Sequence, residues 1–122
     1  MAYRLTQAAE NQIDEILLAS ARVHGIDAVG RYRLLLRTAM VAVGDDPLLP
    51  GSSEVPRLPG IRAYPARLTR QRITPALRVR TPRHLVVYRV ASDGVVEILG
   101  VVHDRKVLSR AARTADRNAD QP

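Results

Sequence analysis

Two apolar runs, Leu85–Val90 and Val95–Val102, dominate the hydrophobic pattern of the chain. Both are rich in valine, isoleucine and leucine, and the turn-forming residues Ser92-Asp93-Gly94 lie between them. Asp-Gly favours a tight turn because glycine readily adopts the positive φ that such a turn requires. The pattern therefore predicts a β-hairpin. Apolar residues also fill most outward positions of both runs, which indicates central strands with at least one face covered by helices.

The first third of the chain has apolar residues at the three-and-four spacing typical of helices. One helix is predicted to begin after Thr6, whose hydroxyl can cap it, and to end near Gly25. Asp27 is expected to cap a second helix that Gly44 ends. The link between the two is so short that they must form an antiparallel pair. The apolar stripes are Ala9, Ile13, Ile16, Leu17 and Ala21 in the first helix and Val29, Tyr32, Leu36, Ala39, Met40 and Val43 in the second.

Prolines interrupt the segment between the helices and the hairpin, and residues 47–60 are expected to form a loop. The run Ile61–Leu68 predicts an edge strand that bends at Pro65. Leu77 and Val79 alternate with arginines, which favours a further strand with a basic outer face.

After the hairpin, residues 106–113 are expected to form a short helix and residues 114–122 a flexible polar tail. The sequence thus predicts a single α+β domain over residues 1–113. In it, an N-terminal αα-hairpin packs on a small antiparallel β-sheet.

Composition excludes several classes of chemistry. The chain has 122 residues and no cysteine, which rules out disulfides, thiolate catalysis and cysteine-based zinc sites. The three histidines, His24, His84 and His103, are scattered without the spacing of metal ligands, so we expect no metal and no cofactor. We see no signal peptide and no apolar run near the ~18 residues of a membrane span, so we expect a cytoplasmic protein.

The positive charge is concentrated in the second half of the chain. Residues 1–54 carry 5 basic and 7 acidic side chains, whereas residues 55–122 carry 14 basic and 5 acidic ones. Between Glu54 and Asp93 there are nine arginines and no acid. Such a field of one sign attracts a polyanion, either a nucleic acid or an acidic protein. The alternative is a solvated arginine-rich surface without a partner.

Six short segments, in order, resemble the ParE branch of the RelE/ParE toxins of type II toxin–antitoxin systems. The resemblance covers most of the chain, from Tyr3 to Arg105. The similar segments are Tyr3-Arg4-Leu5-Thr6-Gln7-Ala8-Ala9, Ile13-Asp14-Glu15-Ile16, His24-Gly25-Ile26-Asp27-Ala28 with Tyr32, Leu58-Pro59-Gly60-Ile61-Arg62-Ala63-Tyr64, His84-Leu85-Val86-Val87-Tyr88-Arg89-Val90 and Ile98-Leu99-Gly100-Val101-Val102-His103. Three features differ from the family. Residues 67–82 form a basic insertion or an extended hairpin, and Gly100 stands where the family often has an arginine. The family's aspartate shortly after the final histidine is displaced, since here Asp104 follows His103 at once.

The resemblance implies a RelE/ParE-like fold and one of two activities. ParE-like members inhibit DNA gyrase, a type II topoisomerase, whereas RelE-like members are ribosome-dependent mRNA endonucleases. We expect a gyrase inhibitor and not an enzyme, because the chain has only one lysine and the nuclease resemblance leads us to expect several. A third reading is a binding module that keeps the fold without toxicity.

A nuclease on this fold would need a base for the ribose hydroxyl and cations for the phosphate. Its candidate catalytic residues here are Arg62, Tyr88, His103 and Arg105. Strand alternation places Tyr88 with Val86, which favours a core tyrosine, and places His103 with Leu99 and Val101. For His103 a structural role is the preferred interpretation.

The resemblance also implies a cognate antitoxin with an acidic C-terminal segment that wraps the toxin. DNA contact is then expected only through the antitoxin. A disordered acidic segment that folds on binding suits a broad basic surface. The candidate partner-binding residues are Arg62, Arg67, Arg70, Arg72, Arg78, Arg80, Arg83 and Arg105.

Overall fold

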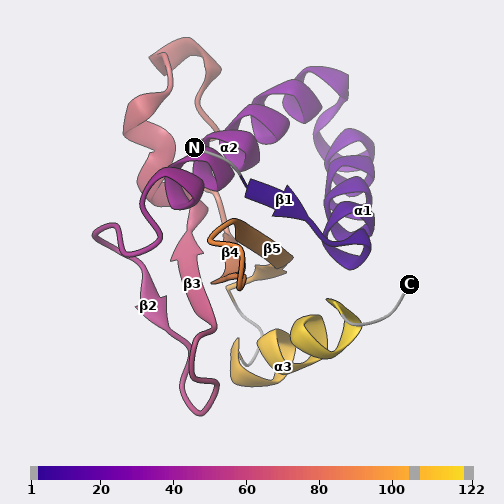
Figure 1. Cartoon of the computed structure of the whole chain (residues 1–122). Coiled ribbons are helices and arrows are strands. Elements are labelled where there is room, and N and C mark those ends of the chain that lie inside the picture. Colours follow the sequence, from indigo (N-terminus) through magenta and orange to yellow (C-terminus); the bar gives the residue numbers. More distant parts are fainter. Residues whose placement is uncertain (1–2, 105–107, 120–122) are drawn as a thin grey trace.

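A computed structural model describes residues 3–104 and 108–119, which form an α+β domain built on one five-stranded sheet (Figure 1). The elements in chain order are β1 (Tyr3–Leu5), α1 (Gln7–His24), α2 (Ile26–Asp45), β2 (Ser53–Glu54), β3 (Arg62–Pro65), the 3₁₀ helices η1 (Ala66–Arg72) and η2 (Pro75–Leu77), β4 (His84–Val90), β5 (Val96–His103) and α3 (Leu108–Ala119). The strand order is β1-β5-β4-β3-β2. All neighbours are antiparallel except β1, which is parallel to β5. The predicted α+β architecture is confirmed.

The two N-terminal helices form the expected αα-hairpin. Thr6 caps α1, because its side-chain oxygen accepts a hydrogen bond from the Ala9 N–H at 3.1 Å. Gly25 makes the turn with a φ of 87°, a value that favours glycine. The predicted cap of the second helix is wrong. The helix begins at Ile26, so Asp27 lies in its first turn and not at the cap position. There the positive end of the helix dipole stabilises its carboxylate.

The central strands bury side chains on both faces of the sheet. On one face, Val86 and Tyr88 pack with residues of α1 and α2. On the other face, Val87 and Leu99 pack with Ala115 of α3. Figure 1 shows α2 above the sheet, α1 beside it at the right and α3 below it. Burial on both faces explains why both hairpin strands are apolar at nearly every position.

A β-bulge interrupts the alternation of strand β5. Val87 lies opposite Gly100 but the next residue, Tyr88, lies opposite Ile98, so Leu99 has no partner on β4. The extra residue reverses the faces beyond it. Val101 therefore packs toward the helical hairpin and Val102 toward α3. The predicted placement of His103 with Leu99 is wrong for this reason, because His103 follows Val101 onto the opposite face.

The helix α1 holds the bulge in place. The Gln12 Oε1 atom accepts a hydrogen bond from the backbone N–H of Val101 at 2.9 Å. A Cβ atom on Gly100 would lie only 2.6 Å from that oxygen and 3.3 Å from the Ala115 Cβ. This close approach accounts for glycine at position 100, because the space beside the backbone leaves no room for a side chain.

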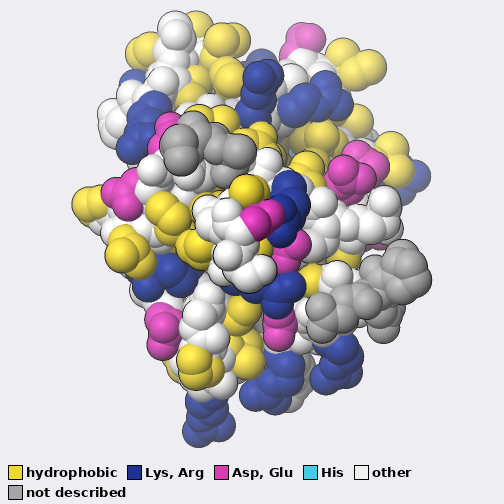
Figure 2. All heavy atoms as spheres, viewed as in Figure 1, with side chains coloured by type: hydrophobic (Ala, Val, Ile, Leu, Met, Phe, Trp, Pro, Cys, Tyr) yellow, Lys and Arg dark blue, Asp and Glu magenta, His cyan; other side chains and the backbone are white. Residues whose placement is uncertain are grey.

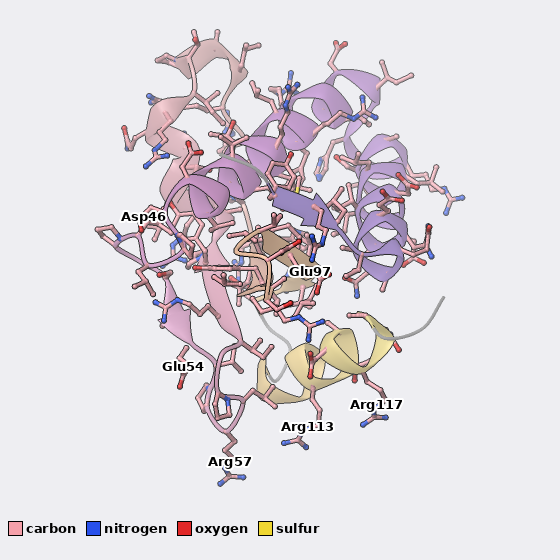
Figure 3. The ribbon with its side chains drawn as sticks, viewed as in Figure 1. Asp46, Glu54, Arg57, Glu97, Arg113 and Arg117 are labelled. Carbon is pink, nitrogen blue, oxygen red and sulfur yellow. The ribbon has the colours of Figure 1, made fainter. Side chains whose placement is uncertain are left out.

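A chain of ion pairs joins β1, the hairpin and α3. Arg4 reaches Asp93 at 2.7 Å and Glu97 at 3.4 Å. Arg89 contacts the other oxygen of Glu97 at 2.8 Å and Asp116 at 2.7 Å. Figure 3 shows Glu97 between the strands and α3. These contacts satisfy the charge of Arg89, which shares its face of β4 with the apolar Leu85 and Val87.

The C-terminal helix extends further than expected. It runs to Ala119, through residues for which we predicted a flexible polar tail. Two interactions hold this part of the helix against the sheet. Ala115, which is 2% exposed, packs with residues of β4 and β5, and Asp116 pairs with Arg89. Lys106, where the helix was expected to begin, lies outside the described residues.

The segment between β3 and β4 also differs from the prediction. The predicted edge strand is β3, which ends at Pro65 instead of Leu68, and a 3₁₀ helix follows it directly. Its placement at the edge is wrong, because β3 pairs with β4 on one side and with the short strand β2 on the other. Leu77 belongs to a second 3₁₀ turn, in which its N–H donates to the Thr74 carbonyl at 2.9 Å. Its side chain is 48% exposed. No strand forms at Leu77 and Val79, so residues 67–82 are not an extended hairpin.

Tyr88 and Arg62 lie opposite each other on β4 and β3 and meet at one backbone carbonyl. The Tyr88 hydroxyl donates to the Pro47 oxygen at 2.5 Å, and Arg62 Nε donates to the same oxygen at 3.2 Å. A second nitrogen of Arg62 donates to Ser52 Oγ at 2.8 Å. Tyr88 is fully buried, as predicted for a core tyrosine. The pair therefore fastens the loop after α2 to the sheet.

Replacing Tyr88 with phenylalanine should lower the free energy of unfolding by about 1 kcal/mol, because the buried hydroxyl loses its acceptor. Urea denaturation would measure the change. The control is Tyr64→Phe, since the Tyr64 ring is also buried but its hydroxyl bonds to no described residue. The control should be near neutral. Equal losses in both variants would contradict the assigned role of the Pro47 contact.

Candidate partner-binding surface

A cleft of about 690 Å³ opens between the helical hairpin and the segment that precedes β4. Its apolar wall comes from α1 and α2 and includes Ile16, Val23 and Tyr32. Val23 is 73% exposed although it is a large hydrophobic residue. The facing wall carries Arg78 and Arg80. An apolar wall that faces a cationic wall suits an amphipathic acidic segment.

The basic segment that forms the facing wall is held by its own arginines. Arg70 Nε donates to the Val79 carbonyl at 2.9 Å, and Arg78 Nε donates to the Ile73 carbonyl at 2.8 Å. Ile73 is buried in the core and anchors the middle of the segment. Two of the predicted partner-binding arginines therefore also have structural roles, which the sequence did not indicate.

A polar cluster lies where the cleft meets the end of the hairpin. The Tyr32 hydroxyl hydrogen-bonds to His84 Nδ1. The His84 and His103 rings meet edge to face, with centroids 5.4 Å apart. His103 Nδ1 lies 3.2 Å from one oxygen of Asp104, and Arg83 Nε lies 3.0 Å from the other. The cluster links α2 to both strands of the hairpin.

Burial keeps the inner part of this cluster uncharged. Burial, with the neighbouring His103 adding to it, lowers the pKa of His84 to about 4. Burial likewise raises the pKa of Tyr32 to about 12. Near neutral pH, Tyr32 therefore carries its proton and His84 is a neutral imidazole that can accept it in a hydrogen bond.

The candidate nuclease residues do not form one cluster. Arg62 and Tyr88 lie together at the Pro47 carbonyl. His103 lies opposite His84, which is four residues along β4 from Tyr88. At the usual rise per strand residue this separates them by about 13 Å. Arg105 lies outside the described residues.

The candidate partner-binding arginines divide between two neighbouring surfaces. Arg78 and Arg80 line the cleft. A separate open hollow of about 700 Å³ is lined by Arg67, Arg70, Arg80 and Arg83. Arg62 lines neither cavity, because it is engaged with the loop after α2. Arg72 lies near Tyr64, where its charge lowers the phenol pKa against the larger, opposite effect of burial.

Some notable residues were not anticipated. Tyr32 was expected to belong to the apolar stripe of α2, and His84 was considered only as a metal ligand and rejected, so neither was a candidate site residue. Lys and Arg side chains gather along the lower edge of the molecule in Figure 2. Figure 3 shows Arg57, Arg113 and Arg117 pointing outward there. The spacing of Arg113 and Arg117 would have indicated a shared helix face if α3 had been predicted at its full length.

Within residues 3–104 and 108–119, no group of three acidic or histidine side chains comes together as ligands for a metal ion. No helix in the same ranges is long and apolar enough to cross a membrane.

The free energy of unfolding should fall as the pH drops from about 6.5 toward 4, in part because of His84. Across this window a histidine in the unfolded chain binds a proton while folded His84 stays neutral, so protonation favours unfolding. The expected contribution is about 1 kcal/mol, since partial solvent exposure weakens the effect. His84→Asn keeps an acceptor for Tyr32 but does not titrate, so chemical denaturation should show a flatter pH dependence.

His24→Asn is the matched control for this pH series. It also removes one histidine, but His24 is exposed at the end of α1. The control should retain the pH dependence of the original protein. If His84→Asn retained it as well, the buried imidazole would not be the titrating group.

Two kinds of similarity, to a solved structure and to a family model, place the chain among known proteins. A solved structure described as a chromosomal ParDE TA system from P. aeruginosa shares the fold, with a TM-score of 0.60 at 16% sequence identity. The match covers 84% of this chain and 95% of that one. No curated protein matches the sequence. A family model for the ParE toxin of the type II toxin–antitoxin system parDE matches residues 3–108. That match spans most of the domain described above, and the chain belongs to the ParE toxin family.

Proposed function

We propose that this chain is the toxin of a type II toxin–antitoxin pair and that it inhibits DNA gyrase. The observation that carries the proposal is the family match across residues 3–108, which includes every strand of the sheet and the helical hairpin. The resemblance to ParE toxins points to gyrase as the target.

The distribution of polar side chains favours gyrase inhibition over mRNA cleavage. Cleavage of RNA needs a base and cations around one phosphate. Here Tyr88 is fully buried with its hydroxyl on the Pro47 carbonyl, and Arg62 uses its nitrogens on that carbonyl and on Ser52. Neither side chain is available for a substrate without releasing the loop after α2. His103 contacts His84 and Asp104 at the far end of the strand.

Two assays on one preparation test the proposed target. The purified chain should inhibit supercoiling by DNA gyrase in a concentration-dependent manner and leave mRNA on translating ribosomes intact. The control is the same chain saturated with its cognate antitoxin, which should leave supercoiling normal. Cleaved mRNA together with normal supercoiling would show that the target is the translating ribosome and not gyrase. If the folded protein had no effect in either assay, the result would favour a binding module without toxicity.

The second part of the proposal is that the cleft receives the acidic C-terminal segment of the antitoxin. The solved ParDE structure with the same fold is described as a toxin–antitoxin system. The cleft offers apolar side chains on one wall and Arg78 and Arg80 on the other. This matches an amphipathic segment whose apolar face enters the cleft and whose acids meet the arginines. Val23 in the wall of the cleft and Ile26, three residues further along the chain, are both exposed.

Val23→Glu should weaken antitoxin binding by about tenfold or more, because it places a carboxylate where the partner is apolar and acidic. This substitution is preferable to changes at Arg78, whose Nε also holds the Ile73 carbonyl. The matched control is Leu48→Glu, since Leu48 is 71% exposed and does not line the cleft. Titration calorimetry with the cognate antitoxin measures both. Unchanged affinity for Val23→Glu would remove the cleft from the interface.

A further inference from the structure

Four arginines surround the open hollow beside the cleft. Arg67 and Arg70 come from the 3₁₀ helix η1, and Arg80 and Arg83 come from the chain that leads into β4. A 3₁₀ helix has three residues per turn, so residues three apart lie on the same side, about 6 Å apart along the axis. The two guanidinium groups of η1 therefore extend from the same side of the helix.

The charge of the hollow is only partly compensated. Among the described residues that line it, Asp104 is the only acid, and it is already engaged by Arg83 at 3.0 Å and by His103 at 3.2 Å. Arg67 and Arg80 are exposed and pair with no carboxylate among the described residues. The hollow is therefore a concentrated positive field that an anion can neutralise.

Part of the hollow is ordered before any ligand arrives. The Nε of Arg70 donates to the Val79 carbonyl at 2.9 Å, and the Nε of Arg83 is held by Asp104. An arginine fixed through Nε retains its two terminal nitrogens as further donors. Side chains held in this way lose less conformational entropy on binding, which favours affinity.

The lining indicates which anion fits. A guanidinium group pairs with phosphate oxygens through two parallel hydrogen bonds. An amphipathic acidic peptide would need apolar pockets, and the hollow offers only Leu68 and Pro82 besides its polar lining. The neighbouring cleft provides the apolar wall that such a peptide requires. The open shape suits an extended backbone that crosses the surface.

We propose that the hollow formed by Arg67, Arg70, Arg80 and Arg83 binds the phosphodiester backbone of a nucleic acid directly. This differs from the expectation that the toxin meets DNA only through its antitoxin. Backbone contacts carry no base information, so binding is independent of sequence. The inference does not rest on gyrase as the target, because it concerns the isolated chain and its own arginines.

Fluorescence anisotropy with a labelled 20-base-pair DNA duplex tests the proposal over a series of salt concentrations. The wild-type chain should bind, with affinity falling steeply as salt rises. Arg67→Gln/Arg80→Gln should weaken binding about tenfold or more at low salt. It should also flatten the slope of log affinity against log salt by about 2, since two phosphate contacts are lost. A parallel series with single-stranded RNA shows which nucleic acid is preferred.

The matched control is Arg113→Gln/Arg117→Gln, which removes the same charge from α3, outside the lining of the hollow. It should leave the salt slope unchanged. An equal loss in the control would assign binding to net charge rather than to the hollow. Absence of binding to both nucleic acids would overturn the proposal. Displacement of DNA by polyglutamate at equal charge concentration would also overturn it, because the hollow would then not distinguish phosphate from carboxylate.

Discussion

The fold depends on one irregularity, the extra residue at Leu99 in strand β5. The bulge lets a single strand present Ile98 and Val101 to the helical hairpin and Leu99 and Val102 to α3, so both layers of the core close on it. The displaced backbone needs a hydrogen-bond partner, and the Gln12 side chain supplies it to the Val101 N–H. The first helix is thereby tied to the position of the sheet where the two faces exchange.

The same bulge determines which polar groups meet. In an unbroken hairpin, the register near the turn would place Val102 opposite His84. The extra residue brings His103 there instead, on the side where Tyr32 reaches down from α2. Period-two alternation could not predict this cluster, because the acceptor that holds the bulge comes from Gln12, 89 residues away in the sequence. The helices and the hairpin themselves were predictable, since their periodicity is local.

The segment between β3 and β4 shows the other limit of local patterns. Leu77 and Val79 alternate with arginines as in a strand, but a strand is stable only with a partner for its backbone groups. Here Arg70 and Arg78 bind carbonyls of their own segment, at Val79 and Ile73, and replace the missing ladder. The charge of this segment and the prolines at its two ends were evident from the sequence. It could not show that some arginines serve as internal braces while others face solvent.

Because some arginines of this segment bind its own carbonyls while others face solvent, one basic segment can present two different surfaces. The chain from η2 to β4 is a wall with the apolar cleft on one side and the arginine hollow on the other, and Arg80 lines both. An acidic antitoxin segment in the proposed cleft would draw Arg80 toward its carboxylates and reduce the positive field of the hollow. Binding at the two proposed sites is then mutually unfavourable, and each ligand lowers the affinity of the other by the same factor. The antitoxin-bound chain would thus have a lower affinity for nucleic acid, without any change in the fold.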